Sequence, residues 1–161
     1  MRYVSVTQDE YGNNLDPTAY VKRLPTIAQS LPAGARAFAT DPDHYDFFSR
    51  RCVKDLLLDR VEFTDNGGEV DLLLGFRHNC WKHEEDLTIR YQGIRSFTLD
   101  LPENEPNWRL LREVVLDEIL PAPGGCTHEI DCLAGTVLIA CRDLEASWAE
   151  ADCPDRNRST T

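Results

Sequence analysis

Alternation of apolar and polar residues between Val53 and Arg142 is the feature that most constrains the fold of this chain. Every even position of Val70–Phe76 is apolar, and Leu87–Tyr91 alternates in the same way. A period of two places one set of side chains on the buried face of a strand and the other set in water. The pattern therefore predicts a mostly antiparallel β-sheet.

Other segments extend this sheet. Val53–Phe63 is predicted as a strand with three side chains pointing inward, namely Leu57, Val61 and Phe63. The sequence Asp65-Asn66-Gly67-Gly68 then predicts a hairpin turn, because asparagine and glycine tolerate the positive φ of tight turns.

The second half of the chain continues the pattern after a turn or bulge at Gln92-Gly93. Strands are predicted at Ile94–Leu101, Cys126–Cys132 and Thr136–Cys141, and the last two form a hairpin. Leu110–Leu120 stays open between a helix and a strand, because its alternation and its pair of adjacent valines also suit a strand.

Helical signals are confined to the first third. Asp16-Pro17 is a typical helix start, with a capping carboxylate before a proline at the first helical position. A single helical stripe follows: Tyr20, Val21, Leu24, Ile27, Ala28 and Leu31. Pro25 lies inside this pattern and should kink or split the helix, and Pro32 should end it.

These segments predict an α+β fold, an antiparallel β-sheet of about six or seven strands with short N-terminal helices packed on it. The expected domain spans residues 1–150, with a helical part at 1–50 and a sheet part at 53–143. Residues 151–161 are polar and are predicted to form a loose tail.

The net charge of −11 lies in the later part of the chain. Residues 1–52 are neutral, whereas residues 53–102 carry −4 and residues 103–161 carry −7. An acidic surface repels phosphate groups, which argues against nucleic acid, and it attracts a basic protein partner. The charge also fits the simpler role of keeping the protein soluble.

The cellular compartment is predicted from two kinds of segment that the sequence lacks, a membrane span and a secretion signal. No apolar run approaches the ~18 residues of a membrane span, and residues 1–10 lack the apolar core of a secretion signal. We therefore expect no membrane association and a cytoplasmic location. Reduced thiols are expected in that compartment for the six cysteines: Cys52, Cys80, Cys126, Cys132, Cys141 and Cys153.

One set of side chains could bind zinc. His78 shares a strand face with Cys80, and Cys126 shares one with His128, so the two pairs could converge on one ion. The spacing matches no standard zinc motif, and the same residues also suit the core or its rim. A cysteine nucleophile beside a histidine is the enzymatic version of this idea, but the sequence names no third orienting group.

Two acidic groups have structural explanations as well as chemical ones. The cluster Asp41-Pro42-Asp43-His44-Tyr45-Asp46 could hold a cation, although aspartates beside a proline usually cap turns. The carboxylates of Glu113, Asp117 and Glu118 could serve acid–base chemistry, or could simply form a solvated face.

The three tryptophans, Trp81, Trp108 and Trp148, each lie near the end of a predicted element. Tryptophan is enriched in protein interfaces, although each of these could also cap the core. Combined with the neighbouring acidic residues, they give a predicted partner-binding set: Trp81, Glu84, Glu85, Asp86, Trp108, Asp117 and Glu118.

Several segments resemble a known group of proteins in the order and spacing of their short strands. They are Cys52-Val53-Lys54-Asp55, Leu87–Tyr91, Gly93-Ile94, Asp117-Glu118-Ile119, His128-Glu129-Ile130-Asp131 and Gly135–Asp143. Over roughly 90 residues the chain resembles a group of small uncharacterised bacterial β-rich proteins. This group includes immunity-protein-like members of polymorphic toxin systems. The resemblance implies a domain without enzymatic residues, and it transfers no functional residue.

The sequence therefore predicts a non-enzymatic acidic domain that binds a basic protein and uses no cofactor. The narrower form of this prediction is an immunity-type inhibitor of a basic toxin. The alternative is a zinc-binding domain or metal-dependent enzyme using His78, Cys80, Cys126 and His128.

Overall fold

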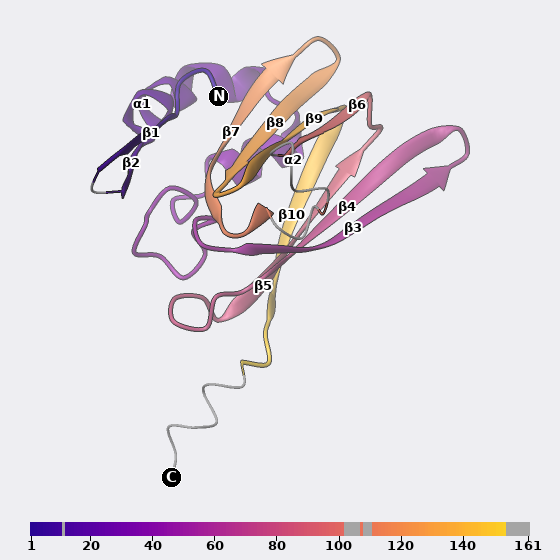
Figure 1. The fold of residues 1–161 in the computed structure, drawn as a ribbon. Helices are drawn as coiled ribbons and strands as arrows, with labels where there is room; N and C mark the ends of the chain where they lie inside the picture. The colour runs from indigo at the N-terminus through magenta and orange to yellow at the C-terminus, as the bar shows by residue number, and fades with distance from the viewer. Residues whose placement is uncertain (11, 102–106, 108–110, 154–161) are drawn as a thin grey trace.

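The computed structural model describes residues 1–161 except 11, 102–106, 108–110 and 154–161. The described residues form ten β-strands and two short α-helices (Figure 1). The strands are β1 (Ser5–Asp9), β2 (Gly12–Asp16), β3 (Leu57–Asn66), β4 (Glu69–Arg77), β5 (Glu85–Gln92), β6 (Ser96–Asp100), β7 (Val114–Ala122), β8 (Gly125–Cys132), β9 (Gly135–Cys141) and β10 (Asp143–Glu150). The helices are α1 (Thr18–Ile27) and α2 (Ala33–Ala39), with a 3-10 helix η1 (Ala28–Ser30) between them.

The strands pair antiparallel in three sheets. β1 pairs with β2, the second sheet has the order β10-β5-β4-β3, and the third has the order β6-β9-β8-β7. The predicted α+β character is confirmed. The prediction of one sheet with six or seven strands is wrong, because the chain passes between two four-stranded sheets.

Two continuous segments make that passage. β5 leads into β6 through Gly93, and β9 leads into β10 through Arg142. Gly93 has φ +57°, a conformation that glycine adopts readily, and the Arg142 amide donates to the Gln92 carbonyl at 2.9 Å. The predicted irregularity at Gln92-Gly93 is thus the bend of an antiparallel ribbon that belongs to both sheets.

The β3–β4 hairpin follows its turn sequence. Asn66 and Glu69 form its last pair, and Gly67 and Gly68 have φ +66° and +101°. The inward set predicted for β3 is partly wrong, because the register shifts between Leu58 and Arg60. Leu58, and not Leu57, therefore lies on the inward face and is buried. Val61 and Phe63 lie on that face as predicted, opposite the buried Leu74 and Leu72, although Phe63 is 54% exposed.

The described part of the ambiguous segment Leu110–Leu120 overlaps strand β7, which begins at Val114 and continues to Ala122. All six residues of Val114–Ile119 are buried. One edge of β7 pairs with β8, and at its start the Val114 amide donates to the Leu56 carbonyl at 2.8 Å. A strand buried on both faces loses the alternation that identifies strands in a sequence.

One hydrophobic core joins the two four-stranded sheets. Leu74 and Ile89 of the second sheet and Ile130 and Ile139 of the third belong to the same buried cluster. Burial of this apolar area is the main source of stability. The sheets also share a buried hydrogen bond, since the Tyr91 hydroxyl lies 2.8 Å from Nδ1 of His128.

α1 begins at Thr18, one residue later than predicted, and a second helix follows it. The Thr18 amide donates to the Asp16 carboxylate at 2.9 Å, but Pro17 and not Asp16 occupies the N-cap position of α1. Pro25 lies inside α1, which continues to Ile27 before the chain tightens into η1. Leu31 then adopts an extended conformation and α2 begins after Pro32.

Three strands were absent from the prediction. The first fifty residues contain the β1–β2 hairpin as well as the helices, and β10 extends the sheet region from residue 143 to Glu150. Within the described part of the chain, none of the helices is both long and apolar enough to span a membrane.

Candidate functional site: an acidic groove

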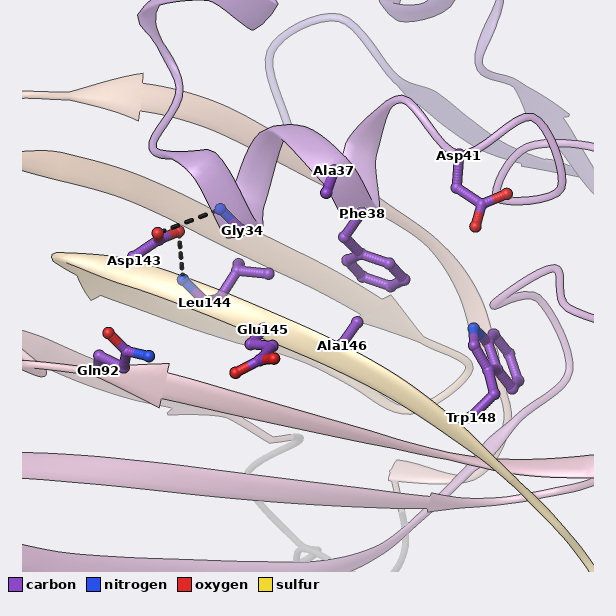
Figure 2. A pocket seen from close by; sticks show the side chains of 10 residues that line it. All are labelled: Gly34, Ala37, Phe38, Asp41, Gln92, Asp143, Leu144, Glu145, Ala146 and Trp148. Atoms are coloured by element: carbon purple, nitrogen blue, oxygen red, sulfur yellow. Dashed lines mark hydrogen bonds between the residues drawn. The ribbon is translucent and has the colours of Figure 1, made fainter.

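A surface groove of about 460 Å³ lies between α2 and β10 (Figure 2). Its lining residues come from three places in the sequence: Gly34, Ala37, Phe38, Asp41, Gln92, Asp143, Leu144, Glu145, Ala146 and Trp148. Among these residues are three carboxylates and no lysine, arginine or histidine. The electrostatic potential in the groove therefore favours a cation.

The wall formed by α2 is held against β10 at one end. The Asp143 carboxylate accepts hydrogen bonds from the amides of Gly34 and Ala35 at 3.1 and 2.9 Å, satisfying two donors at the start of α2. Figure 2 shows the bond to Gly34 together with a third bond, from the Leu144 amide. The backbones meet so closely that a Cβ on Gly34 would lie 2.0 Å from the Leu144 carbonyl oxygen. Only glycine permits this approach.

The open part of the groove combines charge with aromatic surface. Figure 2 shows Phe38 reaching from α2, Asp41 beyond the end of that helix, and Trp148 farther along β10 than Glu145. Asp41 accepts a hydrogen bond from the Asp43 amide at 2.9 Å, whereas Glu145 is exposed. A carboxylate can hold a guanidinium or ammonium group by ion pairing, and an indole can hold one by cation–π contact.

β10 also offers backbone groups. It lies at the end of its sheet, and no strand of the described residues pairs with its outer edge. Unpaired amides and carbonyls at a sheet edge can bind an extended peptide as an additional strand.

The predicted partner-binding residues are dispersed. Trp81 is 73% exposed and lines a second hollow of about 360 Å³ with Leu133 and Glu113. Glu84 and Glu85 form ion pairs with Arg50 and Arg51. Trp108 lies outside the described residues.

Asp86 of the same predicted set lies beside a histidine. Its carboxylate accepts hydrogen bonds from the backbone amide and from the ring nitrogen Nδ1 of His78, each at 2.7 Å. Like the two glutamates before it, it therefore already has a partner within the chain.

Asp117 and Glu118 must be removed from the predicted surface. Their exposures are 1% and 2%, because both lie in the doubly covered strand β7. Buried carboxylates require partners, and each has several. Glu118 accepts hydrogen bonds from the amides of Arg2, Tyr3 and Val4, the last at 2.9 Å, and so holds the N-terminal segment against β7.

Asp117 lies at the centre of a buried polar network. Nε2 of His44 and Nε2 of His128 each approach its carboxylate to 2.8 Å. Nδ1 of His44 lies 2.9 Å from the Phe38 carbonyl, and Nδ1 of His128 contacts Tyr91. The network joins β7, β8, β5 and the segment after α2 through side chains alone.

Charge attraction decides the protonation of this network. Burial by itself would raise the pKa of Asp117, but attraction to His44 and hydrogen bonds from both histidines outweigh burial and lower that pKa. Burial would likewise lower the pKa of His44, but Asp117 raises it. The adjacent space lined by Asp117 and His128 is only about 10 Å³, room for about one water molecule.

The same contacts resolve the predicted acidic cluster. His44 is committed to Asp117, and Asp41 closes a turn by accepting from Asp43. These contacts give His44 and Asp41 structural roles, as is usual for carboxylates beside a proline, and Asp41 also lines the groove.

The four predicted zinc ligands do not come together among the described residues. Sγ of Cys126 lies 3.6 Å from Sγ of Cys141 in the neighbouring strand, and His128 belongs to the Asp117 network. His78 and Cys80 remain together, but their third neighbour is Cys153. Although all six cysteines are described, no disulfide joins them.

Comparisons of the chain with protein-family models, with curated proteins and with solved structures each found no match. The site must therefore be interpreted from its own chemistry.

Sequence reasoning missed the groove and Cys153. Leu144, Ala146 and Trp148 alternate with Glu145 and Ser147, which is a strand signal that could have identified β10. Nothing in the sequence brings α2 beside β10, because more than a hundred residues separate them. Cys153 was assigned to the predicted tail, where no pattern pairs it with His78.

Proposed function

We propose that this protein is a non-enzymatic binding domain that holds a basic, extended segment of a partner protein in the groove between α2 and β10. The observation that carries the proposal is the composition of that groove, which has three carboxylates, no basic side chain among its lining residues, and two aromatic side chains. The net charge of −11 would accelerate association with such a partner.

Two features support an extended segment over a small cation. The groove runs along a strand edge without a partner strand, so backbone hydrogen bonds can fix the segment. Glu145 and Trp148 are three residues apart and therefore lie on opposite faces of β10. If the partner segment pairs with β10 as an extra strand, its side chains on one face lie near Glu145 and those on the other face lie near Trp148. A basic toxin inhibited by this domain is the specific form of the proposal, motivated by the resemblance of the sequence to immunity-type proteins.

Binding can be tested with the paired variant Asp41→Asn/Glu145→Gln. Affinity capture from the native host at low salt should recover a basic protein, and the groove variant should weaken its binding about ten-fold or more by reducing electrostatic attraction. Raising the salt should weaken binding to the unmodified protein and have less effect on the variant.

The matched control is Asp59→Asn/Glu62→Gln, which removes the same charges from exposed positions of β3 at the opposite edge of the sheet. If both pairs weaken binding equally, overall charge and not the groove is responsible. Binding that ignores both salt and the groove substitutions would overturn the proposal.

A further inference from the structure

Three potential metal ligands meet where strand β4 ends and the chain leaves β10. His78, Cys80 and Cys153 place one ring nitrogen and two sulfur atoms within 4.8 Å of one another. Nε2 of His78 lies 3.3 Å from Sγ of Cys80. Zinc bond lengths of about 2.0–2.1 Å to nitrogen and 2.3 Å to sulfur imply a nitrogen–sulfur separation of about 3.6 Å in a tetrahedral site.

The orientation of His78 suits a metal ligand. Its Nδ1 lies 2.7 Å from the Asp86 carboxylate, so the opposite nitrogen, Nε2, faces the sulfur atoms. A carboxylate behind a ligating imidazole fixes the ring and strengthens it as a ligand. The Asp86 carboxylate also accepts from the His78 amide at 2.7 Å, which anchors the same residue by its backbone.

The loop between β4 and β5 is folded to present this cluster. His83 accepts from the Asn79 amide through Nδ1 at 3.2 Å, and its Nε2 lies 2.9 Å from the Cys52 carbonyl. Both ring nitrogens of His83 are therefore used in shaping the loop. On the opposite side, the Ala151 amide donates to the Glu84 carbonyl at 3.1 Å and brings Cys153 toward the loop.

We propose that His78, Cys80 and Cys153 bind one zinc ion, with Asp86 as the carboxylate partner of the ligating histidine. Two sulfur ligands and one imidazole favour zinc over the harder cations magnesium and calcium. Three protein ligands leave the fourth tetrahedral position for water or another small ligand. The ion would fasten the segment after β10 to the loop between β4 and β5, independently of the groove.

The test uses the full chain purified without a histidine tag under reducing conditions. Elemental analysis after zinc addition and gel filtration should give about one zinc per chain, and zinc should raise the melting temperature by binding only the folded state. Cobalt substituted for zinc should show sulfur-to-metal charge transfer and the strong visible bands of tetrahedral coordination.

The variants separate the proposed ligands from other thiols. Cys153→Ser and Cys80→Ser should lose binding by more than the roughly 10- to 100-fold expected for Asp86→Asn, which removes only the outer partner. Cys132→Ala is the matched control for a buried thiol elsewhere, and Glu85→Gln is the control for Asp86→Asn. Both controls should bind zinc as the unmodified protein does.

Three results would overturn the site. They are less than about 0.2 zinc per chain with no thermal shift, zinc retained by Cys153→Ser, or a Cys80–Cys153 disulfide found in protein kept reduced. Because the unmodified chain is titrated directly, a variant that fails to fold does not leave the question open.

Discussion

Acidic residues on β7 and β10 differ in burial and in their hydrogen bonds. Asp117 and Glu118 of β7 are buried and receive hydrogen bonds from distant segments, whereas Glu145 of β10 lies exposed along a groove. Asp143 is intermediate, since it is half-buried and caps α2. Burying a carboxylate is favourable only when partners replace its water, so the β7 pair contributes to stability and the exposed group is available for binding.

The largest effect should come from Asp117→Ala. It removes the shared partner of two buried histidines and should lower the free energy of unfolding by about 3–5 kcal/mol. Urea unfolding followed by circular dichroism measures this change. A loss below about 1 kcal/mol would show that the network contributes little and would remove the contrast with β10.

Protonating Asp117 by a change of pH should lower the free energy of unfolding less than Asp117→Ala does, because the protonated side chain keeps its volume. The folded pKa of Asp117 lies below its ordinary value of 3.8, so its contribution is present above pH 3.8 and is lost as pH falls through the folded value. The folded pKa of His44 lies above 6.5, so its contribution is complete below pH 6.5 and is lost as pH rises through the folded value.

For this pair, stability should therefore be greatest between those two pH values. Urea unfolding across the pH range measures the profile, and Asp117→Asn, which cannot titrate, should flatten both sides of it. An unchanged profile in that variant would assign the pH dependence to other groups.

A smaller loss is expected for Glu118→Ala. Three backbone amides of the N-terminal segment would lose their acceptor, at a cost of about 1–3 kcal/mol. Hydrogen exchange should accelerate at Tyr3 and Val4, while β4 and β5 keep their protection relative to global unfolding. Uniform acceleration across the chain would contradict a local role.

The smallest changes belong to β10. Asp143→Ala removes the cap of α2 and should cost about 1 kcal/mol in thermal or urea unfolding. Glu145→Gln should change stability by less than about 0.5 kcal/mol, because its carboxylate is at the surface. If Glu145→Gln destabilised the protein more than Asp143→Ala, Glu145 would be structural and the groove would lose a binding residue.

The same contrast explains what the sequence could predict. Strands β4 and β5, buried on one face, follow the alternation of Leu72, Leu74, Leu87 and Ile89, and the β3–β4 turn follows Asn66-Gly67. These features are local, and local patterns are what a sequence displays most directly.

The candidate sites depend on distant contacts. The polarity of Asp117 suggests a surface position until its histidines, 73 residues before and 11 residues after it, are placed beside it. The groove needs α2 beside β10, and the zinc site needs Cys153 beside His78. Each depends on the bend of the β5–β6 and β9–β10 ribbon; Gln92-Gly93 predicts an irregularity there, but no short segment specifies which distant strands it brings together.

That bend also sets an order of assembly. β3, β4 and β5 can join through short connections, but the partner of β5 on its other side is β10, about fifty residues later in the chain. Closing so long a loop is slow, and β5 remains an uncovered edge until β10 arrives. Covering that edge of β5 is thus a second consequence of β10, the strand that forms one wall of the groove, and a chain without β10 would expose β5 to pairing with another copy.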